Sequence, residues 1–429
     1  MKTKINILTG RKYRFALMGL VFLVLSCQKD EILFFPNELL NNQESTTDNE
    51  ENDSDDREND SDNGENDSDN EDIITDQELY FDVPDANFEQ ALIDLSIDDV
   101  PDGRVLISNA QGVYSLDVQN RGIEDLTGIA YFVDLINLNC RINTISRLDL
   151  SNNILLKVLN CGENNLKNLN LNNLPALQQL YCYSNELTCL DMSSNPELTY
   201  ICGYFNNLVS INITKNPKLR ILFLHSNKLT SLDVTKNPIL TNLSCLHNEI
   251  TALDVSNNPL LTELNCADNK IKTLDASNKP DLVTLQCGLN NLIRLNISGA
   301  TSLKTLNCFV NQLTSLNVDD STELTYLNCQ KNQIMSLDVH NNTNLVSFYC
   351  SDNRLSLIDV TSNAALESFY PSQNQLTSLD LSNNTILTKM IGHHNPYLTC
   401  IQVNQTQLNN IPSGWSKDAH VSYSEDCFY

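Results

Sequence analysis

The chain has 429 residues and a formal net charge of −27 at pH 7. Between Asn41 and Glu78 there are 17 acidic residues, and Arg57 is the one basic residue of that stretch. A surface this acidic repels nucleic-acid phosphates and anionic bilayers. This excludes nucleic-acid binding as the function.

Residues 1–26 predict an export signal. A basic start is followed by the apolar run Phe15–Leu25, which is too short to span a membrane comfortably and fits a secretory signal. The run ends in Val24-Leu25-Ser26-Cys27, which resembles a bacterial lipobox. That resemblance implies cleavage before Cys27 and lipidation of this cysteine. An ordinary signal peptide with an incidental cysteine is the alternative.

Residues 27–78 are predicted to form a lipidated cysteine and an acidic linker. Gln28-Lys29-Asp30-Glu31 resembles the signature that sends some Gram-negative lipoproteins to the outer face of the outer membrane, although it also fits a merely polar stretch. Near-copies of Glu-Asn-Asp-Ser-Asp follow at 51–55, 58–62 and 65–69. They lack apolar residues that could seed a core, so we expect a disordered, extended stalk. Calcium binding is the alternative, but the fixed Gly and Glu of an EF-hand loop are missing.

Residues 79–112 are predicted to form an N-terminal cap. Phe88, Ala91, Leu92 and Leu95 have the spacing of one face of a helix. Asp85 stands where it can cap the first turn of this helix. Such an element can cover the end of a stack of repeats, which would otherwise expose its hydrophobic cross-section.

Residues 113–407 are built from a repeated unit, 22 residues long in the first, degenerate turn and 21 residues long afterwards. The unit is L-x-x-L-x-C-x-x-N-x-L-x-x-L-D-V-S-x-N-P-x, with a clear copy from Leu261 to Asp281. A strict period of this length with this Leu/Asn pattern predicts a leucine-rich-repeat solenoid, which usually offers a long binding surface. The asparagine recurs without a slip as Asn143, Asn164, Asn185, Asn206, Asn227, Asn248, Asn269, Asn290, Asn311, Asn332, Asn353, Asn374 and Asn395.

Each unit contains nearly the same phrase twice, as in Leu261–Asn269 and Ile271–Lys279. Both halves alternate like a short strand with two inward side chains, and neither has room for a helix. The predicted fold is therefore a mainly β repeat solenoid, a straight rod with two short parallel strands per 21-residue turn that form two sheets. We expect the repeated asparagine to point inward and to satisfy backbone groups of the turns.

The unit resembles the bacterial 21-residue class of leucine-rich repeats with a nested half-repeat, and more broadly the internalin-like surface proteins. The resemblance covers residues 79–429. Val83-Pro84-Asp85-Ala86-Asn87-Phe88 resembles the N-terminal cap of that family. Leu398–Val403, Trp415 and Ser424–Cys427 resemble its C-terminal cap, which we place at 408–429. The resemblance implies adhesion to host or neighbouring cells.

Nine of the 14 cysteines share one repeat position, which Gly203, Leu224, Pro371 and Gly392 occupy in other turns. This exchange with small or apolar residues predicts buried, packed thiols. A straight row cannot supply a zinc tetrahedron, and parallel Cβ vectors do not converge enough for disulfides. The nine are Cys140, Cys161, Cys182, Cys245, Cys266, Cys287, Cys308, Cys329 and Cys350.

The cysteines outside this ladder differ in whether they are predicted to form a disulfide. Cys400 and Cys427 both lie in the terminal cap, and an exported protein keeps its disulfides, so we predict that they pair. Cys189 and Cys202 occupy outward positions on different strands of the repeat. We expect them to form no disulfide.

No sequence motif of a hydrolase, kinase, metalloprotease or nucleotide-binding protein stands in a suitable context. One acidic series deserves comparison with catalytic or calcium-bridging carboxylates, because it faces outward on the second strand. Its members alternate in phase with Asn170, Asn212, Asn296 and Asn317, which favours a solvated polar face. We therefore predict no enzyme, no cofactor and no metal. The series is Asp191, Asp233, Asp254, Asp275, Asp338, Asp359 and Asp380.

Aromatic residues gather at outward positions beside the cysteine strand, while the second strand has none there. Strand alternation predicts that they lie on the surface, where aromatic side chains favour binding. Cross-strand stacking that merely stabilises the sheet is the alternative. The predicted ligand-binding residues are Tyr181, Tyr183, Tyr200, Tyr204, Phe223, His225, Phe309, Tyr326, Tyr349 and Tyr370; His393 occupies a similar position.

Together these features predict an outer-membrane lipoprotein, exposed on the cell surface and monomeric, that touches the membrane through its lipid anchor alone. Its expected partner is an extracellular protein. Two alternatives remain open from the sequence: a glycan-capture protein for nutrient uptake, and a structural protein of the cell envelope that has no saturable ligand.

Overall fold

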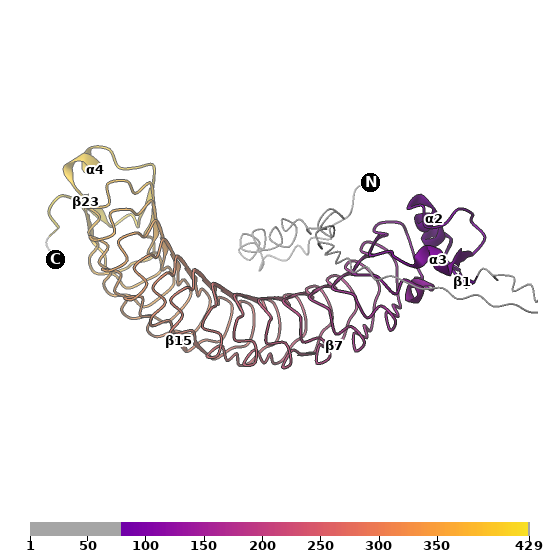
Figure 1. Ribbon diagram of the computed structural model, residues 1–429. Helices are drawn as coiled ribbons and strands as arrows, with labels where there is room; N and C mark the ends of the chain where they lie inside the picture. Colours follow the sequence, from indigo (N-terminus) through magenta and orange to yellow (C-terminus); the bar gives the residue numbers. More distant parts are fainter. Residues whose placement is uncertain (1–78, 428–429) are drawn as a thin grey trace, which may run out of the picture. The chain divides into compact units, whose positions relative to one another are not determined.

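The computed structural model describes residues 79–427, which form one curved solenoid with a cap at each end (Figure 1). The export signal, Cys27 and the acidic linker lie outside the described residues. Among the residues described, no helix is both long and apolar enough to cross a membrane.

The N-terminal cap combines a pair of antiparallel strands with helices. Strand β1 (Tyr80–Asp82) pairs antiparallel with β2 (Arg104–Leu106), and α2 (Ala86–Asp94) lies between them in sequence. The short helix α3 (Ile107–Ala110) and the 3₁₀ turn η2 (Ile129–Tyr131) complete this end.

Asp85 caps α2, as the sequence predicts. Its Oδ1 accepts hydrogen bonds from the backbone N–H groups of Asn87 and Phe88, both at 2.9 Å. Its Oδ2 accepts from the N–H groups of Glu124 at 2.7 Å and Asp125 at 3.0 Å, in the first repeat turn. One carboxylate therefore both starts the helix and fastens the cap to the solenoid.

The first strand of every unit belongs to one parallel sheet of 15 strands, whose end members are β3 (Ser115–Asp117) and β22 (Gly414–Ser416). Equivalent residues pair from turn to turn, as Leu264 does with Leu285. This register keeps the middle residue of each strand inward and buried. Between the ends lie β4 (Asn137–Asn139), β5 (Val158–Asn160), β6 (Gln179–Tyr181), β8 (Tyr200–Cys202), β10 (Ile221–Phe223), β11 (Asn242–Ser244), β12 (Glu263–Asn265), β14 (Thr284–Gln286), β16 (Thr305–Asn307), β17 (Tyr326–Asn328), β18 (Ser347–Tyr349), β19 (Ser368–Tyr370) and β20 (Lys389–Ile391).

The predicted second sheet forms only in pieces among the described turns. Strand β7 (Cys189–Asp191) pairs with β9 (Ser210–Asn212), and β13 (Thr273–Asp275) pairs with β15 (Arg294–Asn296). Figure 1 places these strands on the convex side of the arc and the long sheet on its concave side. Curvature spreads neighbouring turns on the convex side, so continuous pairing at the usual strand spacing is lost there.

The C-terminal cap closes the other end. Strand β21 (Cys400–Gln402) pairs with β23 (Ser422–Ser424), and α4 (Gln405–Asn409) lies between them in sequence. Trp415 in β22 is buried, and its Nε1 donates a hydrogen bond to the carbonyl of Leu387 at 3.0 Å. The predicted disulfide between Cys400 and Cys427 is confirmed.

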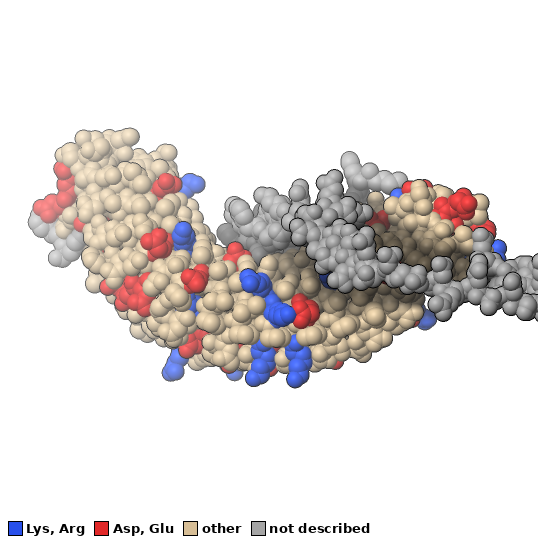
Figure 2. Space-filling model, viewed as in Figure 1, with Lys and Arg blue, Asp and Glu red and all other residues tan. Residues whose placement is uncertain are grey.

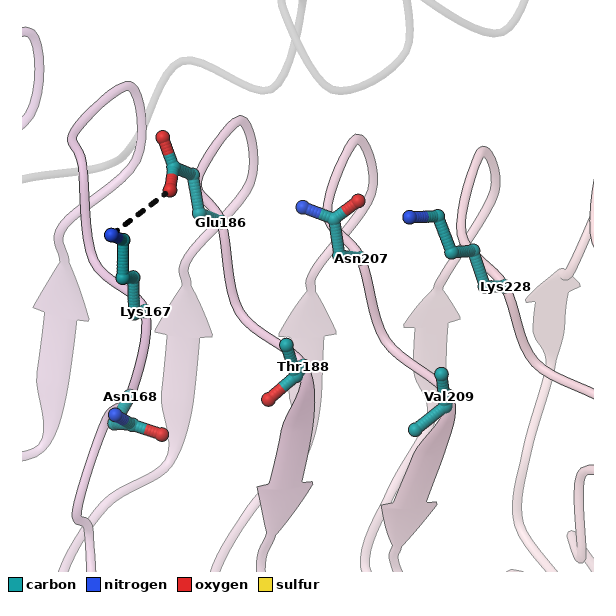
Figure 3. Close-up of a pocket in the computed structure, with 7 residues that line it drawn as sticks. All are labelled: Lys167, Asn168, Glu186, Thr188, Asn207, Val209 and Lys228. Atoms are coloured by element: carbon teal, nitrogen blue, oxygen red, sulfur yellow. Dashed lines mark ion pairs between the residues drawn. The ribbon is translucent and has the colours of Figure 1, made fainter.

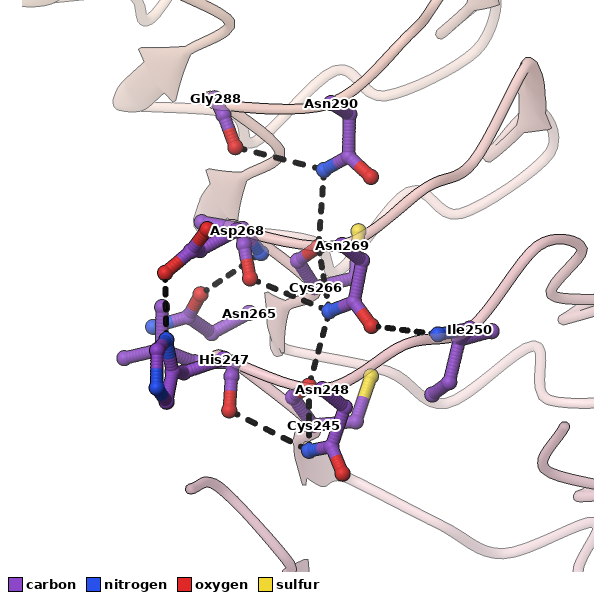
Figure 4. A network of polar contacts seen from close by, with 12 residues as sticks. Cys245, His247, Asn248, Ile250, Asn265, Cys266, Asp268, Asn269, Gly288 and Asn290 are labelled. Carbon is purple, nitrogen blue, oxygen red and sulfur yellow. Dashed lines mark hydrogen bonds and ion pairs between the residues drawn. The ribbon is translucent and has the colours of Figure 1, made fainter. Parts of the chain in front are cut away.

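The repeated asparagines form an inward ladder, shown for three turns in Figure 4. Asn269 Nδ2 donates to the carbonyls of Cys245 at 2.9 Å, Cys266 at 3.2 Å and Ala267 at 3.1 Å. Its Oδ1 accepts from the backbone N–H of Ile250 at 2.9 Å. One side chain thus satisfies backbone groups of two successive turns, in a place that water does not reach.

The residue before each of these asparagines has a left-handed backbone. Asp268, for example, has φ 52°, and no glycine occupies this position in the thirteen turns. Such a conformation is unfavourable for a residue with a side chain. Because this conformation recurs in every turn, we infer that the hydrogen bonds of the following asparagine stabilise it.

A second asparagine ladder supports the other half of most turns. Asn258 Nδ2 donates to the carbonyls of Val234 at 2.9 Å and Asn237 at 2.8 Å. In the next turn Lys279 replaces the asparagine, and its Nζ donates to the carbonyls of Val255 at 2.7 Å and Asn258 at 3.2 Å. Lys279 is buried, and burial lowers its pKa, although Asp275 and Asp254 oppose that shift.

The cysteine ladder lies in the core. All nine ladder thiols are fully buried, and burial raises the pKa of each, for Cys182 to about 12. Protonated, desolvated thiols of this kind behave as small apolar side chains. Cys189 is exposed and Cys202 is buried on the concave side, and neither forms a disulfide.

Replacing Asn269 with alanine should lower the free energy of unfolding by about 2–4 kcal/mol, because the carbonyl of Cys245 and the N–H of Ile250 lose their partners while staying buried. Urea unfolding followed by circular dichroism measures this. Asn257→Ala, in an exposed loop one turn earlier, is the matched control and should change stability by less than about 0.5 kcal/mol. Equal effects of the two substitutions on the free energy of unfolding would contradict the stabilising role of the asparagine ladder.

Lys279→Asn should raise stability by about 1 kcal/mol near neutral pH, because asparagine donates to the same carbonyls without burying a charge. Burial depresses the pKa of Lys279 below its ordinary value of 10.5, so the unfolded chain binds this proton more readily. The native chain therefore gains stability as pH rises toward that value. Urea unfolding at pH 7 and pH 10 should show the gap between the two proteins shrinking. A gap independent of pH would disprove this account of Lys279.

Candidate functional site

The outward face of the fifteen-stranded sheet, here called the concave face, carries all ten predicted ligand-binding residues. Each turn contributes the two residues that flank the inward leucine and the residue after the cysteine position. The structure gathers the aromatic residues into two groups. The first cluster is Tyr181, Tyr183, Tyr200, Tyr204, Phe223 and His225, and the second cluster is Phe309, Tyr326, Tyr349 and Tyr370.

The rings of the first cluster stack along the solenoid axis. Tyr183 and Tyr204 lie 4.9 Å apart between ring centroids at 18°, and Tyr204 and His225 lie 4.4 Å apart at 10°. Beside them, Tyr181 and Tyr200 lie 4.8 Å apart. The ring faces therefore cover one another, and ring edges and polar tips remain as the outward features.

Five members of the first cluster are less exposed than the sequence predicts. Surface positions were expected, but these five side chains keep 6–8% of their surface exposed. Ring stacking contributes to this, because every ring in a stack shields its neighbours. Tyr183 is half-buried. The five are Tyr181, Tyr200, Tyr204, Phe223 and His225.

Two of the aromatic rings pack against a glycine of the preceding turn. A Cβ atom on Gly162 would lie 2.6 Å from the ring of Tyr183, so this ring packs directly against the glycine of the preceding turn. Phe309 rests in the same way on Gly288. Burial raises the pKa of Tyr183, and a hydrogen bond with Arg141 opposes that shift. The glycine is thus part of the aromatic arrangement.

Phe205 is a residue of this site that sequence reasoning missed. It precedes Asn206 in the left-handed position, with φ 51°, and 43% of its surface is exposed. Its ring lies edge-on to Tyr204 at 5.4 Å and to His225 at 5.7 Å between centroids. The signal was present in the sequence, because Phe205 is the one Phe, Tyr or Trp at this position among thirteen turns.

The second cluster is more open. Tyr326 and Tyr349 lie 5.5 Å apart between centroids, and Tyr349 and Tyr370 lie 4.8 Å apart at 22°. All three are half-buried, and burial raises the pKa of Tyr326 and Tyr370. Phe348 and Phe369 stack beneath them in the core at 5.3 Å.

The concave face carries little charge at the first cluster. Its nine outward positions in these three turns hold no Asp, Glu, Lys or Arg: Gln179, Tyr181, Tyr183, Tyr200, Cys202, Tyr204, Ile221, Phe223 and His225. Burial lowers the pKa of His225 to about 4, which leaves it neutral at pH 7. Figure 2 shows charged side chains distributed over the flank of the solenoid.

The acidic series on the second strand has a structural role. Asp254 Oδ1 accepts a hydrogen bond from the N–H of Ser256 at 2.9 Å, and the hydroxyl of Ser256 helps to lower the pKa of Asp254. Asn212 Oδ1 accepts from the N–H of Thr214 at 3.3 Å in the same way. Aspartate and asparagine can therefore alternate, because either side chain closes this turn. Within residues 79–427, no group of three potential metal ligands converges.

The hollow in Figure 3 is lined by side chains from the segments that connect the first and second strands of neighbouring turns, and none of its lining residues belongs to the two aromatic clusters. Its volume is about 580 Å³, and Val209 is the one apolar residue among those that line it. Lys167 and Glu186 form an ion pair there at 4.0 Å, with both side chains exposed. No nucleophile stands beside a base among its lining residues, which are Lys167, Asn168, Glu186, Thr188, Asn207, Val209 and Lys228.

Comparison with solved structures adds to this geometry. The functional domain of InlJ from Listeria monocytogenes, described as including a cysteine ladder, is 35% identical and superposes with a TM-score of 0.68. The match covers 76% of each chain. The chain belongs to the internalin-like leucine-rich-repeat proteins.

Two other solved structures share the fold of this internalin-like chain. An internalin, InlF, from Listeria monocytogenes is 23% identical with a TM-score of 0.63, over 74% of this chain and 98% of that one. The leucine-rich-repeat protein LIC12759 from Leptospira interrogans is 23% identical with a TM-score of 0.55, over 73% and 97%. No protein-family model and no curated protein matches the chain. Its fold is typically a scaffold for binding.

Proposed function

We propose that this internalin-like protein is a surface lipoprotein that binds an extracellular protein through its concave face, in adhesion to host or neighbouring cells. The observation that carries the proposal is the pair of aromatic clusters on one face of a rigid sheet. Aromatic side chains held in place by their neighbours are typical anchors of protein interfaces, because little side-chain entropy is lost on binding.

Ring geometry favours a protein over a glycan. A sugar that stacks on tyrosine needs an exposed ring face, whereas the faces of Tyr183, Tyr204 and His225 are turned toward one another. Ring edges, hydroxyl groups and apolar side chains suit a polypeptide, which offers carbonyl oxygens and apolar side chains of its own. Glycan capture would need rings that lie flat on the sheet with a free face.

The anchor and the cellular location rest on the sequence before residue 79. The lipobox-like motif supports lipidation at Cys27, and the following acidic residues support a stalk that separates the solenoid from the membrane. Such a stalk would hold the solenoid at a distance from the membrane, within reach of another cell.

Brief protease treatment of intact cells tests the location, with a periplasmic protein as the control for leakage. We expect the solenoid to be cleaved or labelled by antibody without lysis. Cys27→Ala should release the protein from the membrane fraction, because the lipid is its proposed anchor. Protection from protease in intact cells would reject surface exposure and leave a periplasmic role.

Binding of the purified chain to candidate host or neighbour cells tests the face itself. Tyr349→Ala combined with Tyr370→Ala should weaken binding at least 10-fold, as expected when a hot spot worth about 2 kcal/mol is removed. Met335→Ala is the matched control and should bind normally. Met335 is 55% exposed and lies on the flank of the solenoid, within two turns of Tyr349 and Tyr370. Protease treatment of the target cells should abolish binding, whereas periodate oxidation of their glycans should not. The opposite pattern would establish glycan capture instead, and an absence of saturable binding would support the structural role.

A further inference from the structure

Phe205 combines exposure with an unfavourable backbone. It is an aromatic residue with φ 51° and 43% of its surface exposed. A left-handed backbone costs a non-glycine residue about 1 kcal/mol or more. All thirteen turns share it at this position, so it belongs to the repeat, and the exposed aromatic ring is what distinguishes Phe205. Glycine would fit this turn better, and packing into the core cannot explain why a large apolar ring stands here.

The surrounding turn holds Phe205 in one position. The N–H of Phe205 donates to the carbonyl of His225 at 3.1 Å. Asn206 Oδ1 accepts from the N–H of Leu187 at 3.0 Å, and its Nδ2 donates to the carbonyl of Cys182 at 3.0 Å. With its backbone fixed and its ring resting edge-on against Tyr204 and His225, Phe205 is ordered before any partner arrives.

The surroundings also limit the chemistry of the partner. The nine outward positions of these three turns carry no acidic or basic residue, in a chain whose net charge is −27. Arg141 hydrogen-bonds Tyr183, but a charged segment placed on Phe205, Tyr204 and His225 would lose its hydration without gaining a counter-ion from these nine positions. Charge complementarity therefore selects an uncharged, apolar polypeptide segment.

We propose that Phe205 is the anchor of the first cluster and inserts among the apolar side chains of an uncharged segment of a protein partner. This inference rests on the proposed function. It names one residue of the concave face that contacts the partner, and it states the chemistry of the partner segment. The exposed ring supplies apolar area to be buried, and its edge-on contacts with Tyr204 and His225 support it.

The decisive variant is Phe205→Gly, because stability and binding should change in opposite directions. Glycine adopts a positive φ without strain, so the variant should unfold at the same or a higher urea concentration than the natural chain. Val310→Gly is the matched control: Val310 occupies the same repeat position with φ 52° beside the second cluster. Phe205→Tyr should keep the anchor.

The probe is a phage library of random dodecapeptides, selected on the full chain carrying Cys27→Ala so that it can be purified without lipid. We expect the selected peptides to be apolar and uncharged. Their affinity should fall at least 10-fold for Phe205→Gly and remain for Val310→Gly and Phe205→Tyr.

Four results would contradict the role of Phe205 as an anchor. They are the absence of any enriched peptide, the selection of charged peptides, equal peptide affinity for the natural chain and Phe205→Gly, and a loss of stability in Phe205→Gly that parallels its loss of binding. The two proposals can fail separately. Peptides lost with Tyr349→Ala but retained by Phe205→Gly would leave the concave face as the binding surface and reject Phe205 as its anchor. Peptides insensitive to both substitutions would reject both proposals.

Discussion

The fold depends on the inward asparagine side chain that closes each turn. A 21-residue turn with three-residue strands leaves many backbone groups without a partner in the ladder of the sheet, and those groups are buried. Asn269 and its twelve equivalents bond to backbone groups of their own turn and of the turn before. A longer or shorter turn would break both sets of bonds, which explains why the period tolerates no insertion from Asn143 to Asn395.

The same constraint has consequences on the surface. Because each asparagine fixes the left-handed residue before it, the residues along this edge of the concave face share one backbone conformation from turn to turn. Cysteine, glycine or leucine can fill the adjoining core position with little change, so turns vary outward while the core repeats. A rigid support with a variable outward face is what a recognition surface needs, since pre-ordered side chains lose little entropy on binding.

Periodicity predicted the fold well, because the interactions that define it recur in every unit. The inward asparagines, the buried cysteines and the pairing of Cys400 with Cys427 all followed from position in the repeat or from departure from it. Curvature did not follow, since it is a collective result of how turns pack, and the second sheet was therefore overestimated. Phe205 was missed because strand alternation describes residues in strands, whereas its orientation comes from a left-handed turn. Stacking of Tyr183, Tyr204 and His225 likewise requires side-chain geometry, which alternation alone does not give.

The proposed function requires the concave face to contact a protein on another cell surface. Site-specific photo-crosslinking tests it most directly, with benzoylphenylalanine in place of Gln330 on the concave face or of Ser336 on the flank of the same turn. After binding to target cells and irradiation, the account predicts a protease-sensitive adduct of defined mass from position 330 and none from position 336. Adducts from position 336 alone would contradict it, because the partner would then bind the flank of the solenoid.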